Sequence, residues 1–165
     1  MSPTVDIQRS LWYAASMTYT DATIAAATGI PNNTLRGWIF RGVLRRPPGG
    51  WTAEDACLLR AVWILAVLGV DLRHAVDLCE ARRAAITSGQ REWLLYMRQP
   101  NAEPTVLVLS RPEDLAAAMA HHARTPGAGT VTIDLARSRE VVLEALREAR
   151  SEARVEPEPQ PEVRA

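Results

Sequence analysis

Two short helix-compatible stretches, separated by Gly29 and Pro31 within residues 20–44, constrain the fold more than any other feature of the chain. Thr20 or Asp21 can cap the first helix, because short polar side chains accept hydrogen bonds from the free amides of a helix start. Gly29 supplies the permissive backbone that a tight turn needs. The sequence therefore predicts a helix, a tight turn and a second helix in immediate succession.

The second stretch predicts an amphipathic helix over residues 32–41, which Pro31 opens. Leu35, Trp38 and Ile39 recur at helical spacing and share one face. The opposite face carries Asn33, Arg36, Phe40 and Arg41. We expect one face to be buried and the other to be available to a ligand.

A basic patch is hidden in a neutral total charge. The chain holds 19 basic and 19 acidic residues, which disfavours a binder that attaches to any polyanion. All the basic residues are Arg, and this indicates a GC-rich genome, so Arg abundance alone says little about function. Between Ala22 and Ala53, however, four Arg occur with no acidic residue. The patch coincides with the second helix and the segment that follows it.

A helix-turn-helix presents its second helix to the major groove of DNA. Arg holds phosphates or reads guanine, and Asn suits adenine. The alternative is that the Asn and Thr side chains only cap the helix and that the Arg side chains are solvated surface charges. We expect DNA contacts from Thr20, Asn32, Asn33, Thr34, Arg36, Arg41, Arg45 and Arg46.

The run from Arg45 to Trp51, Arg-Arg-Pro-Pro-Gly-Gly-Trp, is rigid and then flexible. It follows the apolar pair Val43 and Leu44 and is typical of a short hairpin or wing. Thr52 with Asp55 then makes a start like a capping box for a strongly apolar helix that ends near residue 69. A further helix is predicted over residues 71–88.

At this point the sequence resembles the MerR-like winged-helix family. The likeness covers roughly residues 19–79, and it rests on Ile24-Ala25-Ala26-Ala27-Thr28-Gly29-Ile30-Pro31, Thr34-Leu35-Arg36-Gly37-Trp38, Arg41-Gly42-Val43-Leu44, Thr52-Ala53-Glu54-Asp55 and Leu68-Gly69-Val70-Asp71-Leu72. The resemblance implies that Arg36 and Arg41 contact DNA from a helix in the major groove, and that Arg45 and Arg46 contact the DNA backbone from a wing.

Two features depart from the family. Pro47-Pro48-Gly49-Gly50-Trp51 stands where the family often has an Arg and a Tyr. The long dimerising helix and the cysteine-rich site of metal-sensing members are also absent, so metal sensing is not implied. The broad group includes repressors, excisionase-like architectural proteins and small regulators, and the motif does not separate them.

After residue 89 the pattern changes to an order of strand, strand, helix, strand, helix. We predict strands over residues 93–97, 105–109 and 130–135, with helices from Ser110 to about Arg124 and from Ser138 to about Ala153. A short helix is also expected over residues 6–17. The fold class is therefore α+β: a mainly helical winged helix-turn-helix domain over residues 1–89, a small α/β domain over 90–153, and a disordered Pro- and Glu-rich tail over 154–165.

Other chemistry finds little support in the sequence. His121 and His122 are adjacent on a predicted helix, so they point about 100° apart, and we place them on the surface without a metal. Cys57 and Cys79 are expected to be buried thiols rather than a ligand pair. No nucleophile set or phosphate loop can be assembled, so we expect neither an enzyme nor a cofactor. No signal or membrane segment is evident, which favours a cytoplasmic protein.

The sequence thus predicts a sequence-specific transcriptional regulator, such as a repressor, that binds double-stranded DNA as a homodimer. Residues 90–153 would form the dimer interface, receive a ligand or bind a protein partner. One alternative is a protein-interaction module, such as an antitoxin-like or adaptor protein, whose DNA-binding part is only autoregulatory. Another is an architectural or excisionase-like DNA binder.

Overall fold

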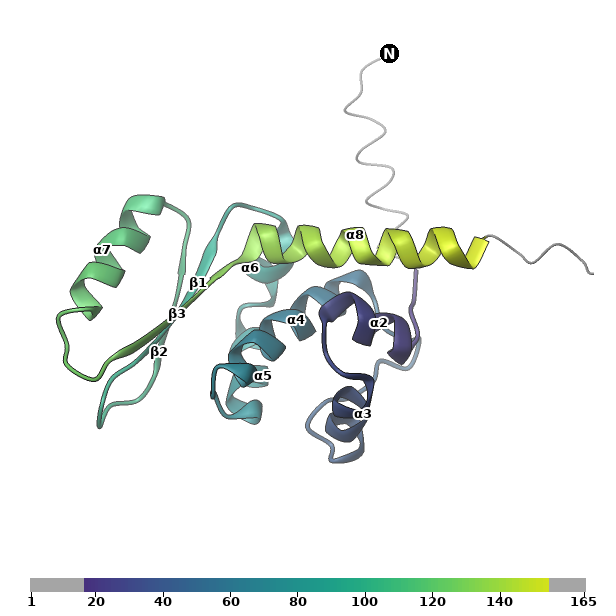
Figure 1. The fold of residues 1–165 in the computed structure, drawn as a ribbon, viewed down its shortest axis with the longest axis horizontal. Coiled ribbons are helices and arrows are strands. Elements are labelled where there is room, and N and C mark those ends of the chain that lie inside the picture. The colour runs from purple at the N-terminus through teal and green to yellow at the C-terminus, as the bar shows by residue number, and fades with distance from the viewer. Residues whose placement is uncertain (1–16, 155–165) are drawn as a thin grey trace, which may run out of the picture.

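The computed structural model describes residues 17–154 and confirms the α+β class (Figure 1). Within these residues, five helices are followed by a hairpin, a helix, a strand and a long helix. The predicted helix over residues 6–17 lies almost wholly outside the described residues, and so does the predicted tail. The elements are α2 (Asp21–Thr28), α3 (Asn32–Phe40), α4 (Ala53–Val67), α5 (Leu72–Ala81), α6 (Arg83–Ser88), β1 (Trp93–Arg98), β2 (Thr105–Leu109), α7 (Pro112–His122), β3 (Gly129–Asp134) and α8 (Leu135–Arg154).

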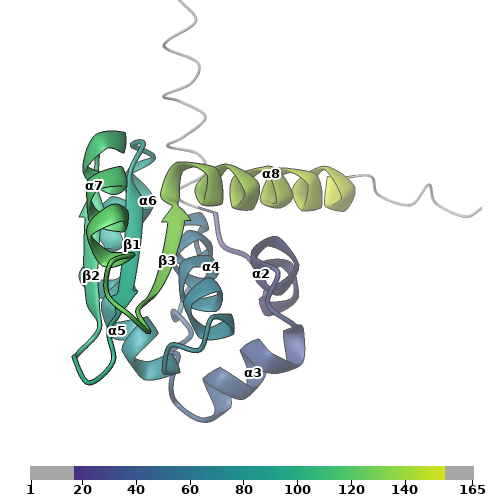
Figure 2. The same cartoon turned by 60° about the vertical axis from the view of Figure 1, so that its left-hand side comes forward.

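The three strands form an antiparallel sheet in the order β2-β1-β3, with Leu95 opposite Leu107 and Thr132. Because side chains alternate along a strand, Leu94 and Tyr96 share one face, and they join the main hydrophobic core. The alternate positions of β1 point to the other face, which α7 covers (Figure 2). The predicted order of strands and helices after residue 89 is therefore confirmed.

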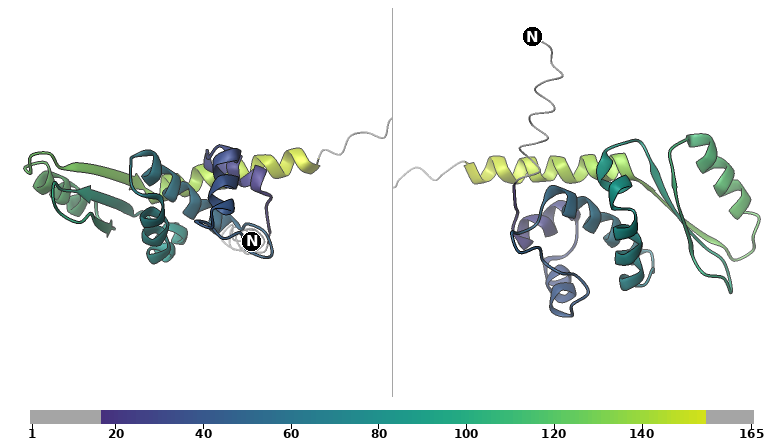
Figure 3. Two further views of the ribbon diagram at one scale, coloured as in Figure 1. Left: turned by 90° about the horizontal axis from the view of Figure 1, so that it is seen from below. Right: turned by 180° about the vertical axis from the view of Figure 1, so that it is seen from behind.

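Helix α8 ties the two halves of the chain together. It runs across α2, α4 and α6 (Figures 1 and 3) and buries Val142 and Leu146 against them. One continuous cluster of buried side chains extends from Ile24 to Leu146. Gly89, at the predicted domain boundary, adopts a left-handed φ of 74°, and a Cβ there would come within 2.9 Å of the Arg139 guanidinium. The second half of the chain thus completes the core of the first.

Several predicted helix boundaries are wrong. The helix expected over residues 71–88 is broken at Arg82, whose φ of −117° and ψ of 15° separate α5 from α6. Ser110 does not cap α7, since Arg111 occupies the N-cap position and the Ser110 hydroxyl instead donates to the Glu92 carboxylate at 3.1 Å. Ser138 lies inside α8 rather than at its start, where the Asp134 carboxylate accepts from the Arg137 amide at 2.9 Å.

The predicted surface position of His122 is also wrong, since only 2% of this residue is exposed. Helix α7 packs one face on the sheet, and His122 lies on that face with its Nε2 3.3 Å from the Gly129 carbonyl oxygen. His121, one position earlier on the helix, is exposed as expected.

Other local predictions are confirmed. Thr52 and Asp55 form the capping box of α4. Cys57 and Cys79 are buried, and burial raises the pKa of the two thiols to about 11 and about 12 respectively. Each therefore stays protonated at neutral pH and behaves as a small apolar side chain.

We predict that Leu146→Ala lowers the free energy of unfolding of the whole chain by about 2–5 kcal/mol, because it leaves a cavity where α8 meets the core. The exposed neighbour Arg147 supplies the control, and Arg147→Ala should change stability by less than about 0.5 kcal/mol. Denaturant unfolding followed by tryptophan fluorescence and circular dichroism measures both. If the first 89 residues unfolded in a transition whose midpoint was the same in Leu146→Ala as in wild type, the shared core would be contradicted.

Candidate nucleic-acid interface

The corner between α2 and α3 is fixed by local hydrogen bonds. The Thr23 amide donates to the Thr20 hydroxyl at 3.3 Å, which caps α2 as the sequence predicts. Gly29 ends α2 with a φ of 75°, a conformation that favours glycine. From α4, the Arg60 guanidinium donates to the Thr28 carbonyl at 3.1 Å. The end of α2 and the turn to α3 are therefore held by the body of the fold.

Helix α3 shows the two faces that its sequence predicts. Leu35 and Trp38 are buried, and the Trp38 ring lies 5.8 Å from the Trp63 ring. The outward face is exposed over Asn32, Asn33, Arg36 and Arg41, while Thr34 is half-buried. At the end of the helix Phe40 is 92% exposed. The predicted reading residues on α3 are therefore available to a large ligand.

Residues 43–51 return from the end of α3 to the start of α2, and we call them the 43–51 segment. The predicted hairpin within this segment does not form, because Pro47 and Pro48 offer no amide hydrogen to a strand ladder. Instead, Tyr19 and Trp51 form an isolated antiparallel bridge, with the Tyr19 amide donating to the Trp51 carbonyl at 2.8 Å. Gly50 permits this return, because a Cβ there would lie 3.0 Å from the Thr18 side chain.

Asp21 connects the start of α2 to the middle and to the end of the 43–51 segment. Its carboxylate accepts from the Trp51 indole at 2.8 Å and forms an ion pair with Arg46, and the Asp21 side chain is only 15% exposed. Burial acts to raise the pKa of Asp21, but the hydrogen bonds from Trp51 and Arg46 outweigh it and hold the pKa below the ordinary value. The sequence indicated Asp21 only as a possible cap, because its partners lie 25 and 30 positions away.

Four of the eight predicted contact residues meet around one open hollow of about 440 Å³. The hollow lies beside the starts of α2 and α3, and its lining consists of Tyr19, Thr20, Asp21, Ala22, Asn32, Arg36 and Arg46. Asn33 and Thr34 are elsewhere on α3, and Arg41 is the C-cap of that helix. Arg45 lines a separate cavity behind the 43–51 segment. Arg46 is only partly available, since it also pairs with Asp21.

No protein-family model matches this chain, and no curated protein matches it.

Among residues 17–154, no three His, Cys, Asp or Glu side chains gather in a way that could hold a metal ion. In that part of the chain, no helix has both the length and the hydropathy that crossing a membrane requires.

We predict that Asp21→Asn lowers the free energy of unfolding by about 1 kcal/mol at neutral pH, because it removes the charge that pairs with Arg46. Because the folded-state pKa of Asp21 is lowered, its contribution is complete above the unfolded-state value of about 3.9 and is lost as the pH falls through the folded-state pKa. The stability difference between wild type and variant should therefore shrink in acid. Asp77→Asn, an exposed change on α5, is the control in denaturant titrations.

Proposed function

We propose that this protein is a sequence-specific DNA-binding transcriptional regulator of the winged helix-turn-helix type. Helix α3 would enter the major groove, and the 43–51 segment would act as a short wing on the neighbouring backbone. The observation that carries the proposal is the division of α3 into a buried face and an exposed face of Asn and Arg, on a corner fixed by Thr20, Gly29 and Arg60.

The exposed side chains fit distinct roles. Arg36, one turn into α3, has the reach and the fork of donors that bind the guanine edge, and Asn32 and Asn33 suit adenine. The hydroxyls of Thr20 and Thr34 can donate hydrogen bonds to phosphate oxygens. Arg41, Arg45 and Arg46 would hold the DNA backbone, with Arg46 aimed by its ion pair to Asp21. Arg36, Asn32 and Asn33 would select the base sequence. The residues that contact phosphates would set the register on the DNA and the affinity.

A second copy of the chain would raise affinity and specificity, because one short helix reads few bases. Strand β2 offers a surface for it: β2 is an edge of the sheet, and its sequence Thr-Val-Leu-Val-Leu carries no charge. Edge strands without charges or bulges are apt to pair with another strand. We therefore assign the proposed homodimer contact to the part of the chain after residue 89.

Selection of bound sequences from a random DNA library by the full-length chain, at near-physiological salt, tests the proposal. Enrichment of one motif that binds more tightly than scrambled DNA is expected, and a palindromic motif together with a dimeric mass in sedimentation would fit the two-fold arrangement. No enrichment, with co-purification of a specific protein, would favour an antitoxin-like or adaptor role instead. Strong bending with cooperative binding to neighbouring sites would favour an architectural role.

We predict that Arg36→Ala weakens binding to the selected site by about 1–3 kcal/mol and relaxes preference at one base position. Arg41→Ala should weaken binding to all sequences alike. It should also reduce, by about 1, the slope of the logarithm of the binding constant against the logarithm of the salt concentration. The control is Arg147→Ala, which changes the same charge on α8, on the far side of the fold from α3 (Figure 1). Equal losses from Arg36→Ala and Arg147→Ala would contradict the role of α3.

A further inference from the structure

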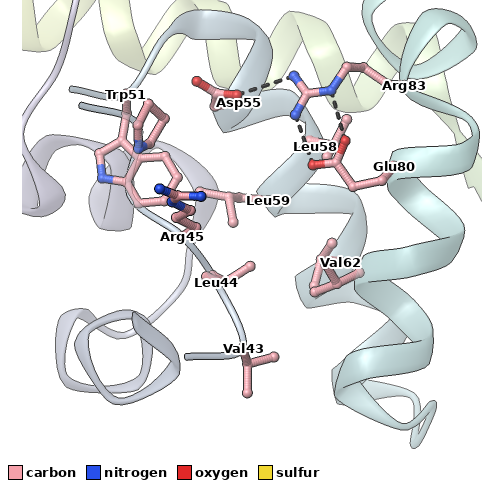
Figure 4. A pocket seen from close by; sticks show the side chains of 12 residues that line it. Val43, Leu44, Arg45, Trp51, Asp55, Leu58, Leu59, Val62, Glu80 and Arg83 are labelled. Carbon is pink, nitrogen blue, oxygen red and sulfur yellow. Dashed lines mark hydrogen bonds and ion pairs between the residues drawn. The ribbon is translucent and has the colours of Figure 1, made fainter. Parts of the chain in front are cut away.

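Phe40, the last residue of α3, is the most exposed large apolar side chain among residues 17–154, with 92% of it accessible to water. It is not part of the hydrophobic core. The apolar residues that follow it behave differently, since Val43 and Leu44 line the cavity between the 43–51 segment and α4 together with Leu59 (Figure 4). The segment thus packs on α4 without Phe40, and the ring stays in water at a cost in free energy.

Phe40 lies on the outermost line of α3. Asn33 and Phe40 are seven positions apart, which is almost two full helical turns, so they point in nearly the same direction. Leu35 and Trp38 point the opposite way and are buried. A molecule that approaches α3 from outside would therefore meet Asn33 and Phe40 first.

Gly37 leaves a gap in the same face, because it neighbours both Asn33 and Phe40 on the helix surface. A glycine inside a helix destabilises it relative to alanine. The backbone of Gly37 is helical, and in the part of the chain that the structure describes a Cβ there would meet nothing within 4 Å. Neither backbone conformation nor packing among those residues requires glycine here, whereas close approach by another molecule would.

The charge around this gap favours a polyanion. Arg36 precedes it and Arg41 follows it, and over residues 17–154 no carboxylate forms an ion pair with either guanidinium. Asp21, whose charge acts on Arg36, already pairs with Arg46. The major groove of DNA matches this combination, because phosphates suit the guanidinium groups and the 5-methyl group of thymine suits an apolar ring.

From these observations we infer that Phe40 contacts the 5-methyl group of a thymine in the major groove and that Gly37 lets the DNA approach α3 closely beside it. This inference rests on the proposed function, since it names a base that the same helix reads. Along the helix axis, Phe40 lies about 10 Å from Asn33, which corresponds to about three base pairs for a helix that lies along the groove. We therefore expect the thymine about three base pairs from the base that Asn33 contacts.

The thymine contact is tested with the duplex that the full-length chain selects, in which deoxyuridine replaces the thymines one at a time. This change removes only the methyl group. At one position it should weaken wild-type binding about fourfold, the effect of one methyl group lost from an apolar contact. Phe40→Ala should bind the thymine and deoxyuridine duplexes equally at that position. The control is Met119→Ala, which removes an exposed apolar side chain of α7 and should discriminate as wild type does.

Three results would overturn the contact. The first is a wild-type chain that discriminates against deoxyuridine at no position. The second is a Phe40→Ala variant that discriminates at the same position as wild type does. The third is a Phe40→Ala variant whose weaker binding comes with a changed mass of the free chain in sedimentation, because the ring would then lie between two copies.

Gly37→Ala gives an independent test, because stability and DNA binding should change in opposite directions. The denaturant midpoint should rise, since alanine favours a helix more than glycine does. The affinity for the selected duplex should fall about tenfold, because the new methyl group occupies the space that the DNA needs. Gly129→Ala, at another glycine where a Cβ would meet nothing within 4 Å, should leave DNA binding unchanged. Undiminished affinity in Gly37→Ala would overturn the close approach.

The outcomes separate this inference from the proposed function. If the chain selected no DNA sequence, both would be contradicted. If it selected a sequence but bound the thymine and deoxyuridine duplexes alike, only the thymine contact would be contradicted.

Discussion

The carboxylate of Asp21 holds together the surface on which the proposed function depends. It accepts a hydrogen bond from the Trp51 indole and pairs with Arg46, so the start of α2 is joined to the end of the 43–51 segment. The backbone bridge between Tyr19 and Trp51 reinforces this junction. Because Pro47 and Pro48 prevent a hairpin within the segment, these contacts replace the strand ladder that would otherwise hold a wing in place.

The rest of the fold supplies a rigid base for that surface. Arg60 from α4 closes the end of α2, Trp38 anchors α3 beside Trp63, and α8 covers α2 and α4 from the other side. The backbone of α3 is therefore held in place beneath its exposed side chains, which lowers the entropy lost on binding.

Features with local signals were predictable from the sequence. The caps at Thr20 and Thr52, the left-handed Gly29 and the two faces of α3 each depend on residues within one or two helical turns. Features that depend on distant contacts were not. The partners of Asp21 lie 25 and 30 positions away, and the burial of His122 depends on packing between α7 and the sheet. The position of α8 over α2 depends on packing between apolar side chains that lie far apart in the sequence, so no local pattern predicts it.

The most direct test of this account is amide mapping by nuclear magnetic resonance of the chain bound to the duplex that it selects. We predict that the largest shifts fall on Thr20, on the exposed face of α3, on Arg41 and on the 43–51 segment. Shifts centred on β2 or α7, or shifts that are the same with scrambled DNA, would contradict the claim that α3 reads the sequence.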